Sequence, residues 1–173
     1  TGAFEAVFNF EKPVVAAING HAIAGGCVLA AACDRRLMAA GDGRIGVTEL
    51  YAGVPFPVGA LEIFRYTVGA ARARDLILTG RACTPDEALA VELVDEVVPA
   101  DELLKRAVTA AREMATLIPP ETFRISKAQL HRETNERVAR HRADNDPEVL
   151  ASWCDPGVGP WARAFVERVR GRG

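Results

Sequence analysis

The sequence predicts an α+β fold, in which a short layer of strands and helix is followed by a run of helices. Two features carry this prediction. Short apolar runs alternate with glycine-rich turns over the first third of the chain, and apolar residues recur at helical spacing from residue 58 onward. Of the 173 residues, 49% are hydrophobic and 25% are charged, so the chain can bury an ordinary globular core.

The first third is predicted to alternate between strand and helix. Residues 14–18 are apolar, follow Pro13 and end at Asn19-Gly20, which is typical of a short buried strand closed by a turn. The predicted elements here are, in order, the later part of a helix over residues 3–8, a strand over 14–18, a helix over 27–33, and strands over 34–40 and 44–46.

The remainder of the chain is predicted to be mainly helical. The best-defined helix start is Thr84, a good N-cap residue, because Pro85 takes the first helical position and Glu87 lies three residues after the cap. The predicted elements are helices over residues 58–68, 71–78 and from 84, a strand over 93–98, and helices over 101–117, 121–140 and 159–170.

Composition and charge exclude several classes of partner. The chain has 21 Lys and Arg against 23 Asp and Glu, and its net charge of -2 supplies no basic field for nucleic acid. The longest uncharged apolar run, residues 22–33, is shorter than the ~20 residues that cross a bilayer, and we see no secretion leader. The four cysteines lack C-x-x-C spacing and the three histidines lack metal-ligand spacing. We therefore expect a reduced, cytoplasmic protein with no membrane partner and no metal.

Residues 20–27 place a strand end, a glycine turn and a helix start in succession. The first N–H groups of a helix have no internal partner and carry the positive end of the dipole, so they can stabilise a phosphate or a developing oxyanion. The spacings of the phosphate loop and of the dinucleotide-binding loop are both absent. The alternative is that Gly25 and Gly26 only permit close packing of helix on strand. For Cys27, a small buried packing residue is favoured over a reactive thiol.

Glu49 is the candidate acid/base residue. It lies three residues beyond Gly46 among apolar neighbours that include Val47 and Leu50. A carboxyl group in such surroundings tends to have a raised pKa, which suits proton transfer near neutral pH. The alternative is a solvated loop charge, as most carboxylates are.

Together these pieces resemble the crotonase superfamily, the enoyl-CoA hydratase/isomerase family. The resemblance covers essentially the whole chain, and the joint occurrence of the motifs in order makes it specific. The matching segments are residues 12–20, 24–27, 33–34, 45–46 with 49, 53–55, 78–80 with 88 and 93–94, 126–127 and 164–167.

The resemblance implies a spiral of ββα units over residues 1–98 and a helical region over residues 99–173 that drives assembly into a trimer or a dimer of trimers. It implies a coenzyme A thioester as ligand, with coenzyme A entering as part of the substrate and no separate cofactor. Members of the family usually carry a further stretch ahead of this point, which bears the first oxyanion-hole amide and much of the coenzyme A site. Since the chain opens at Thr1 without Met, we expect missing residues upstream.

The resemblance also assigns site residues. Gly25 matches the second oxyanion-hole amide, and Glu49 matches the second acid/base glutamate of the hydratases. The residues expected to contact the substrate are Ala24, Val28, Pro55, Phe56 and Phe165.

Two departures from the hydratase pattern bear on the reaction. Val28 stands where hydratases have their first glutamate, and Phe56 replaces a glycine near the water-binding region. Both changes make the pocket drier. Double-bond migration, which needs one acid/base group, is therefore the leading hypothesis. The alternatives are a hydratase-like lyase or other acyl-CoA chemistry, and a protein that binds acyl-CoA without turnover.

The helical tail leaves one further alternative open. Its apolar faces fit either contacts between subunits or packing within one subunit. The residues concerned are Leu150, Trp153, Trp161 and Phe165.

Overall fold

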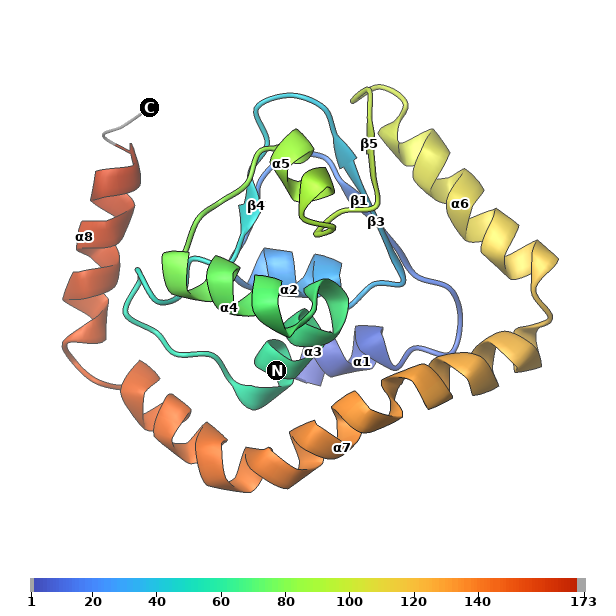
Figure 1. Cartoon of the computed structure of the whole chain (residues 1–173). Coiled ribbons are helices and arrows are strands. Elements are labelled where there is room, and N and C mark those ends of the chain that lie inside the picture. The colour runs from blue at the N-terminus through green and yellow to red at the C-terminus, as the bar shows by residue number, and fades with distance from the viewer. Residues whose placement is uncertain (1, 171–173) are drawn as a thin grey trace.

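A computed structural model of the chain describes residues 2–170 (Figure 1). The elements in order are α1 (Gly2–Phe8), β1 (Val15–Ile18), β2 (Ala22–Ile23), α2 (Gly25–Ala31), β3 (Arg35–Ala39), β4 (Ile45–Gly46), α3 (Val58–Val68), α4 (Ala70–Thr79), α5 (Pro85–Ala90), β5 (Glu96–Val98), α6 (Leu103–Leu117), α7 (Pro120–Trp153) and α8 (Val158–Arg170).

Two small parallel sheets form the β layer. The first has the strand order β1-β3-β5, with Ile18 opposite Met38 and Met38 opposite Val97. The second pairs β2 with β4, placing Ala22 opposite Ile45. Parallel pairing requires a crossover between partners, and α2 supplies it both for β1 with β3 and for β2 with β4.

Strand alternation divides the core in two. Along β3, Met38 belongs to the main apolar cluster with Phe64 and Leu76 of α3 and α4, whereas Leu37 joins a smaller cluster with Leu103 of α6. Successive side chains of a strand point to opposite faces, so β3 is covered on both sides. Burying each such side chain contributes roughly 1.5–3 kcal/mol.

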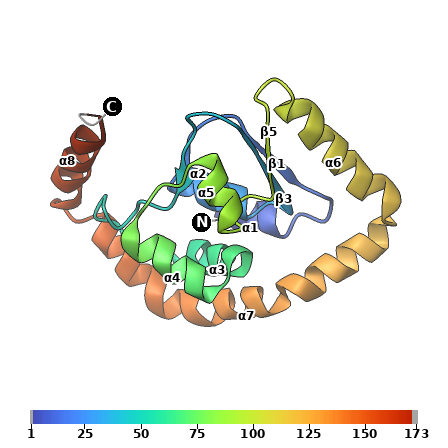
Figure 2. The same cartoon turned by 45° about the horizontal axis from the view of Figure 1, so that its top comes forward.

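The last three helices surround the core on three sides. Figures 1 and 2 show α6 beside the three-stranded sheet, α7 running along the base beneath α1 and α3, and α8 rising on the opposite side from α6. The helical part therefore contacts the core directly. The boundary expected at residues 98 and 99 stays a prediction, although it falls in the gap between β5 and α6.

A buried ion pair ties α7 to the sheet. The Lys127 ammonium lies 2.8 Å from Asp34 Oδ1 and donates to Oδ2 at 2.9 Å, and both side chains are largely buried. The same Oδ2 accepts the N–H of Val14, just ahead of β1, at 2.7 Å. Three of the sequence segments that matched the family, residues 12–20, 33–34 and 126–127, are thus joined in space.

The expected end of the long helix at Arg140 is wrong, because α7 continues to Trp153 with Pro147 in its interior. An interior proline removes one helical hydrogen bond and costs ~3 kcal/mol. Tertiary contacts of the same stretch offset this cost: Arg142 pairs with Glu5 at 2.5 Å, and Asp146 accepts the N–H of Val58 at 2.9 Å.

Two further expectations need correction. The strand predicted over residues 93–98 begins only at Glu96, because the N–H groups of Leu93 and Val94 bond to the carbonyl of Ala88 and form a turn. The two-residue strand β2 was not predicted at all, since a pair of residues carries no periodicity. By contrast, the helix over 58–68 is confirmed, and so is the Thr84 N-cap, which forms a capping box with Glu87.

Candidate active site

The start of α2 is held in an unusual backbone conformation. Ala24, its N-cap, has φ 55° and ψ -124°, in a region that residues other than glycine rarely adopt. The Ala24 N–H donates to the carbonyl of Gly46 at 2.8 Å, and the Ala24 carbonyl accepts the N–H groups of Cys27 and Val28. These bonds fix the direction in which the helix leaves the β layer.

The two amides that follow Ala24 have no partner within residues 2–170. The N–H groups of Gly25 and Gly26 are the first of α2, and both residues are exposed. A Cβ on Gly25 would lie 3.5 Å from Phe4 Cζ, which is an ordinary contact, and one on Gly26 would meet nothing within 4 Å. Close helix–strand packing therefore does not explain these glycines. Unpaired amides at the positive end of a helix can stabilise an oxyanion.

Glu49 lies in a turn after β4 and is half-buried. Its carbonyl accepts the N–H of Val54 at 3.0 Å, which closes the turn. Its carboxylate oxygen Oε2 is buried and has no hydrogen-bond partner among the residues that the structure describes. Burial raises the pKa of Glu49, and the backbone N–H groups of Glu49 and Thr48 oppose this only in part. A carboxyl group with a raised pKa and a free oxygen is suited to accept and return a proton.

Strand pairing brings Glu49 and Gly25 to the same edge of the β layer. Since β2 and β4 are parallel, the segments that follow them leave from the same edge. Gly25 comes two residues after the end of β2, and Glu49 comes three residues after the end of β4. The Ala24 to Gly46 hydrogen bond continues this pairing beyond the strands.

Cys27 lies in the first turn of α2, and its surroundings do not favour a reactive thiol. It is completely buried, and its pKa is raised by burial first, then by the Glu49 carboxylate and by Cys83. The favoured interpretation of Cys27 as a packing residue is thus confirmed.

The residues expected to contact the substrate occupy different surroundings. Val28 is buried in the core at 1% exposure, and Phe56 packs against the same cluster. Ala24 and Pro55 are half-buried. Phe165 on α8 stacks on Tyr51, with ring centroids 6.2 Å apart. Their contacts with a substrate stay predictions.

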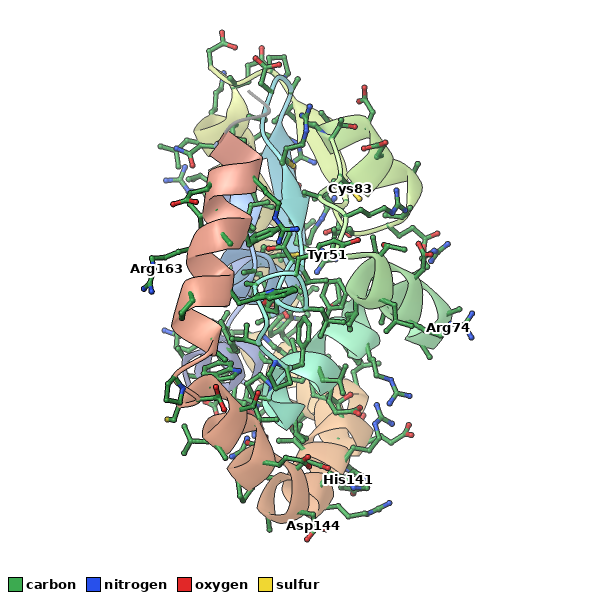
Figure 3. The ribbon with its side chains drawn as sticks, turned by 90° about the vertical axis from the view of Figure 1, so that its left-hand side faces the viewer. Tyr51, Arg74, Cys83, His141, Asp144 and Arg163 are labelled. Atoms are coloured by element: carbon green, nitrogen blue, oxygen red, sulfur yellow. The ribbon has the colours of Figure 1, made fainter. Side chains whose placement is uncertain are left out.

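The C-terminal helices contribute residues that sequence analysis did not assign to the site. Trp161 Nε1 donates to the Tyr51 carbonyl at 2.8 Å, and Trp153 Nε1 donates to the Pro55 carbonyl at 2.9 Å. Figure 3 shows Tyr51 on the core side of α8, whereas Arg163 points away from the molecule. The sequence left open whether the tail contacts another subunit or its own. The indole groups of Trp153 and Trp161 contact their own subunit.

A hollow that the sequence did not predict lies elsewhere in the described chain. It measures about 430 Å³ and is bordered by the Asp34–Lys127 ion pair, Tyr66 and His131. The His131 ring stacks on Phe8 with centroids 3.6 Å apart, and burial lowers its pKa to about 4. Neither Glu49 nor Gly25 lines this hollow, so it is separate from the candidate site.

Within residues 2–170, no group of three or more His, Cys, Asp or Glu side chains could hold a metal ion. None of the helices in that range has the length and apolar character needed to span a bilayer.

Comparison with known proteins identifies the family. Residues 2–155 match the family model described as Enoyl-CoA hydratase/isomerase. The chain belongs to the enoyl-CoA hydratase/isomerase family. It is 39% identical over 127 residues to a probable enoyl-CoA hydratase of Rhizobium meliloti, and 36% identical over 122 residues to the short-chain-enoyl-CoA hydratase of Clostridium acetobutylicum.

A solved structure extends the match to nearly all of this chain. Human mitochondrial delta3-delta2-enoyl-CoA isomerase superposes with a TM-score of 0.86 at 27% identity, over 98% of this chain and 66% of that chain. The crotonase fold expected from the sequence is therefore confirmed.

The chain spans about half the length of the curated relatives it matches. The Rhizobium alignment covers 73% of this chain and 49% of the relative, and the Clostridium alignment covers 70% and 46%.

Proposed function

We propose that this family member acts on acyl-CoA thioesters and moves the double bond of a 3-enoyl-CoA to position 2. Glu49 takes a proton from C2, and the electrons of the broken C–H bond pass to the thioester oxygen as a dienolate. The Gly25 N–H stabilises that oxygen. Glu49 then returns the proton to C4, so that the double bond ends between C2 and C3.

The main support is that Glu49 combines a buried, unpartnered carboxylate oxygen with a raised pKa at the edge where the unpaired amides of α2 begin. An amide in such a position is worth about 3–4 kcal/mol of transition-state stabilisation in other enzymes. A single acid/base group suffices for this reaction.

Val28 favours migration over hydration. Addition of water needs a water molecule held between two acid/base groups, and valine cannot hold water. Its side chain is also 1% exposed, in the core beneath the start of α2. Hydration remains the second candidate because the relatives from Rhizobium and Clostridium are named hydratases.

The test compares two substrates with two proteins. The full protein and its Glu49→Gln variant are assayed with 3-enoyl-CoA for migration and with 2-enoyl-CoA for water addition. We expect migration to be the faster reaction, and to fall by about 10²–10⁴-fold in the variant, as for the loss of a general acid/base group. Faster water addition would favour the hydratase.

Binding without turnover is the outcome that defeats both enzymatic proposals. Calorimetry that detects acyl-CoA binding, with no reaction of any thioester, would establish it. Turnover that depends on Glu49 would exclude it.

We also propose assembly through the helical region, in a trimer or a dimer of trimers. Several large apolar side chains there lack cover within the described chain, and an unpaired apolar face of this kind fits subunit packing. They are Leu104, Leu117 and Leu130, which are 70%, 79% and 66% exposed.

A further inference from the structure

The segment that carries Glu49 has little secondary structure of its own. Residues 49–53 form turns, and residues 54–57 are neither helix nor strand. Two of those four residues, Pro55 and Pro57, have no N–H to donate. Backbone hydrogen bonds within residues 48–54 close the turn itself, and contacts from elsewhere add to them along the path from β4 to α3.

The C-terminal helices supply those contacts at three backbone atoms. The indole N–H groups of Trp161 and Trp153 donate to the carbonyls of Tyr51 and Pro55, at 2.8 and 2.9 Å. At the end of the segment, the Asp146 carboxylate accepts the N–H of Val58 at 2.9 Å. All three donors or acceptors come from α7 or α8, about a hundred residues further along the chain.

Packing at Gly53 reinforces the Trp161 contact. A Cβ on Gly53 would lie 2.7 Å from Trp161 Cδ1, so the indole ring lies against the backbone itself, and the φ of +81° also favours glycine. Next to it, Tyr51 stacks on Phe165. The ring and the N–H of Trp161 thus hold two neighbouring points of the turn that begins at Glu49.

We propose that Trp153 and Trp161 are positioning residues for Glu49: their indole N–H groups hold residues 49–57 closed over the carboxylate, which fixes its place and keeps water from it. This inference rests on the function proposed above. A carboxylate that returns the proton it removed must keep that proton from exchanging with solvent. A segment held closed does so, and a loosened segment admits water.

Removal of each indole N–H with retention of an aromatic ring tests the inference. The variants are Trp153→Phe and Trp161→Phe. The matched control is Arg163→Gln, on the same helix as Trp161 but pointing to solvent (Figure 3). Migration is measured in D₂O, and deuterium at C4 of the product is counted per turnover. This ratio does not depend on the fraction of folded protein, so a merely structural defect leaves it unchanged.

We expect kcat to fall about tenfold in either tryptophan variant, short of the ~100-fold loss caused by a 1 Å misplacement of a reacting group. We also expect more deuterium at C4 per turnover, whereas Arg163→Gln should match the unmodified protein. If the unmodified protein turns over through Glu49 while both tryptophan variants keep its kcat and its deuterium ratio, the positioning role is wrong and the proposed function stands.

A second readout needs no turnover. Hydrogen exchange of the amides of residues 51–54 should speed up in Trp161→Phe and stay unchanged in Arg163→Gln. If the unmodified protein moves no double bond, the proposed function fails and the catalytic role of the tryptophans fails with it. Unchanged exchange in Trp161→Phe would overturn the clamp itself.

Discussion

Replacing Lys127 by methionine should destabilise the fold strongly, because it leaves the Asp34 carboxylate buried without its cation. The side chains of Lys127 and Asp34 are 7% and 12% exposed, and the closest nitrogen–oxygen distance is 2.8 Å. At an effective dielectric constant of about 20, the attraction across that distance is about 6 kcal/mol. Desolvation of both charges offsets part of it, and breaking such a pair by removing one partner typically costs about 3–5 kcal/mol.

Methionine keeps most of the apolar stem of Lys127. The measured loss of stability therefore reports the removal of the positive charge and not a loss of apolar packing. Urea unfolding should show the free energy of unfolding reduced by about 3–5 kcal/mol, and the melting temperature should fall by roughly 10 °C for a chain of this size. The double variant Asp34→Asn with Lys127→Met should recover most of the loss, since an uncharged amide can still accept the N–H of Val14. A loss below about 1 kcal/mol in the single variant, as for a solvent-screened pair, would refute the reasoning.

Three further outcomes follow from the structure. Burial raises the pKa of Glu49, and proton removal needs the ionised form of its carboxyl group. The kcat/KM for migration should therefore be lost as pH falls through a pKa above the ordinary 4.5. A loss of kcat/KM only at or below pH 4.5 contradicts Glu49 as the acid/base group. Ala24→Gly should release about 1–2 kcal/mol of backbone strain, while the greater chain entropy of glycine in the unfolded state costs about 0.5–1 kcal/mol. Urea unfolding should therefore show the free energy of unfolding increased by up to about 1 kcal/mol. A decrease would count against strain at this N-cap. Leu117→Glu should lower the mass measured by light scattering if the helical region joins subunits, and an unmodified protein that is already monomeric rules that assembly out.

Elements that depend on residues close together in the sequence could be predicted from the sequence alone. The helix over 58–68 follows from its apolar spacing, and the Thr84 cap follows from residues that bond within one turn of each other. The strand over 93–98 was predicted too long because its apolar residues also suit a turn, and the choice depended on hydrogen bonds to Ala88.

Long-range contacts decided the features that local patterns missed. The polar stretch around Pro147 looks like a helix end, yet Asp146 and Arg142 hold it in α7 through partners about 90 and 137 residues away. For the site, Gly25 and Glu49 could be named from motifs. The hydrogen bonds of Trp153 and Trp161 to this segment could not be predicted, since an aromatic residue on a polar helix fits an interface between subunits equally well.

The two indole contacts join residues 98 and 110 positions apart, which has a consequence for biosynthesis. Glu49 and the start of α2 leave the ribosome before α8, so the two indole contacts to the segment around Glu49 can form only after α8 has emerged. A nascent chain therefore carries the proposed acid/base group before it can hold that group in place, and the proposed activity has to wait for α8. Chains released early, at any point before Trp161, should fold much of the core and remain poor catalysts.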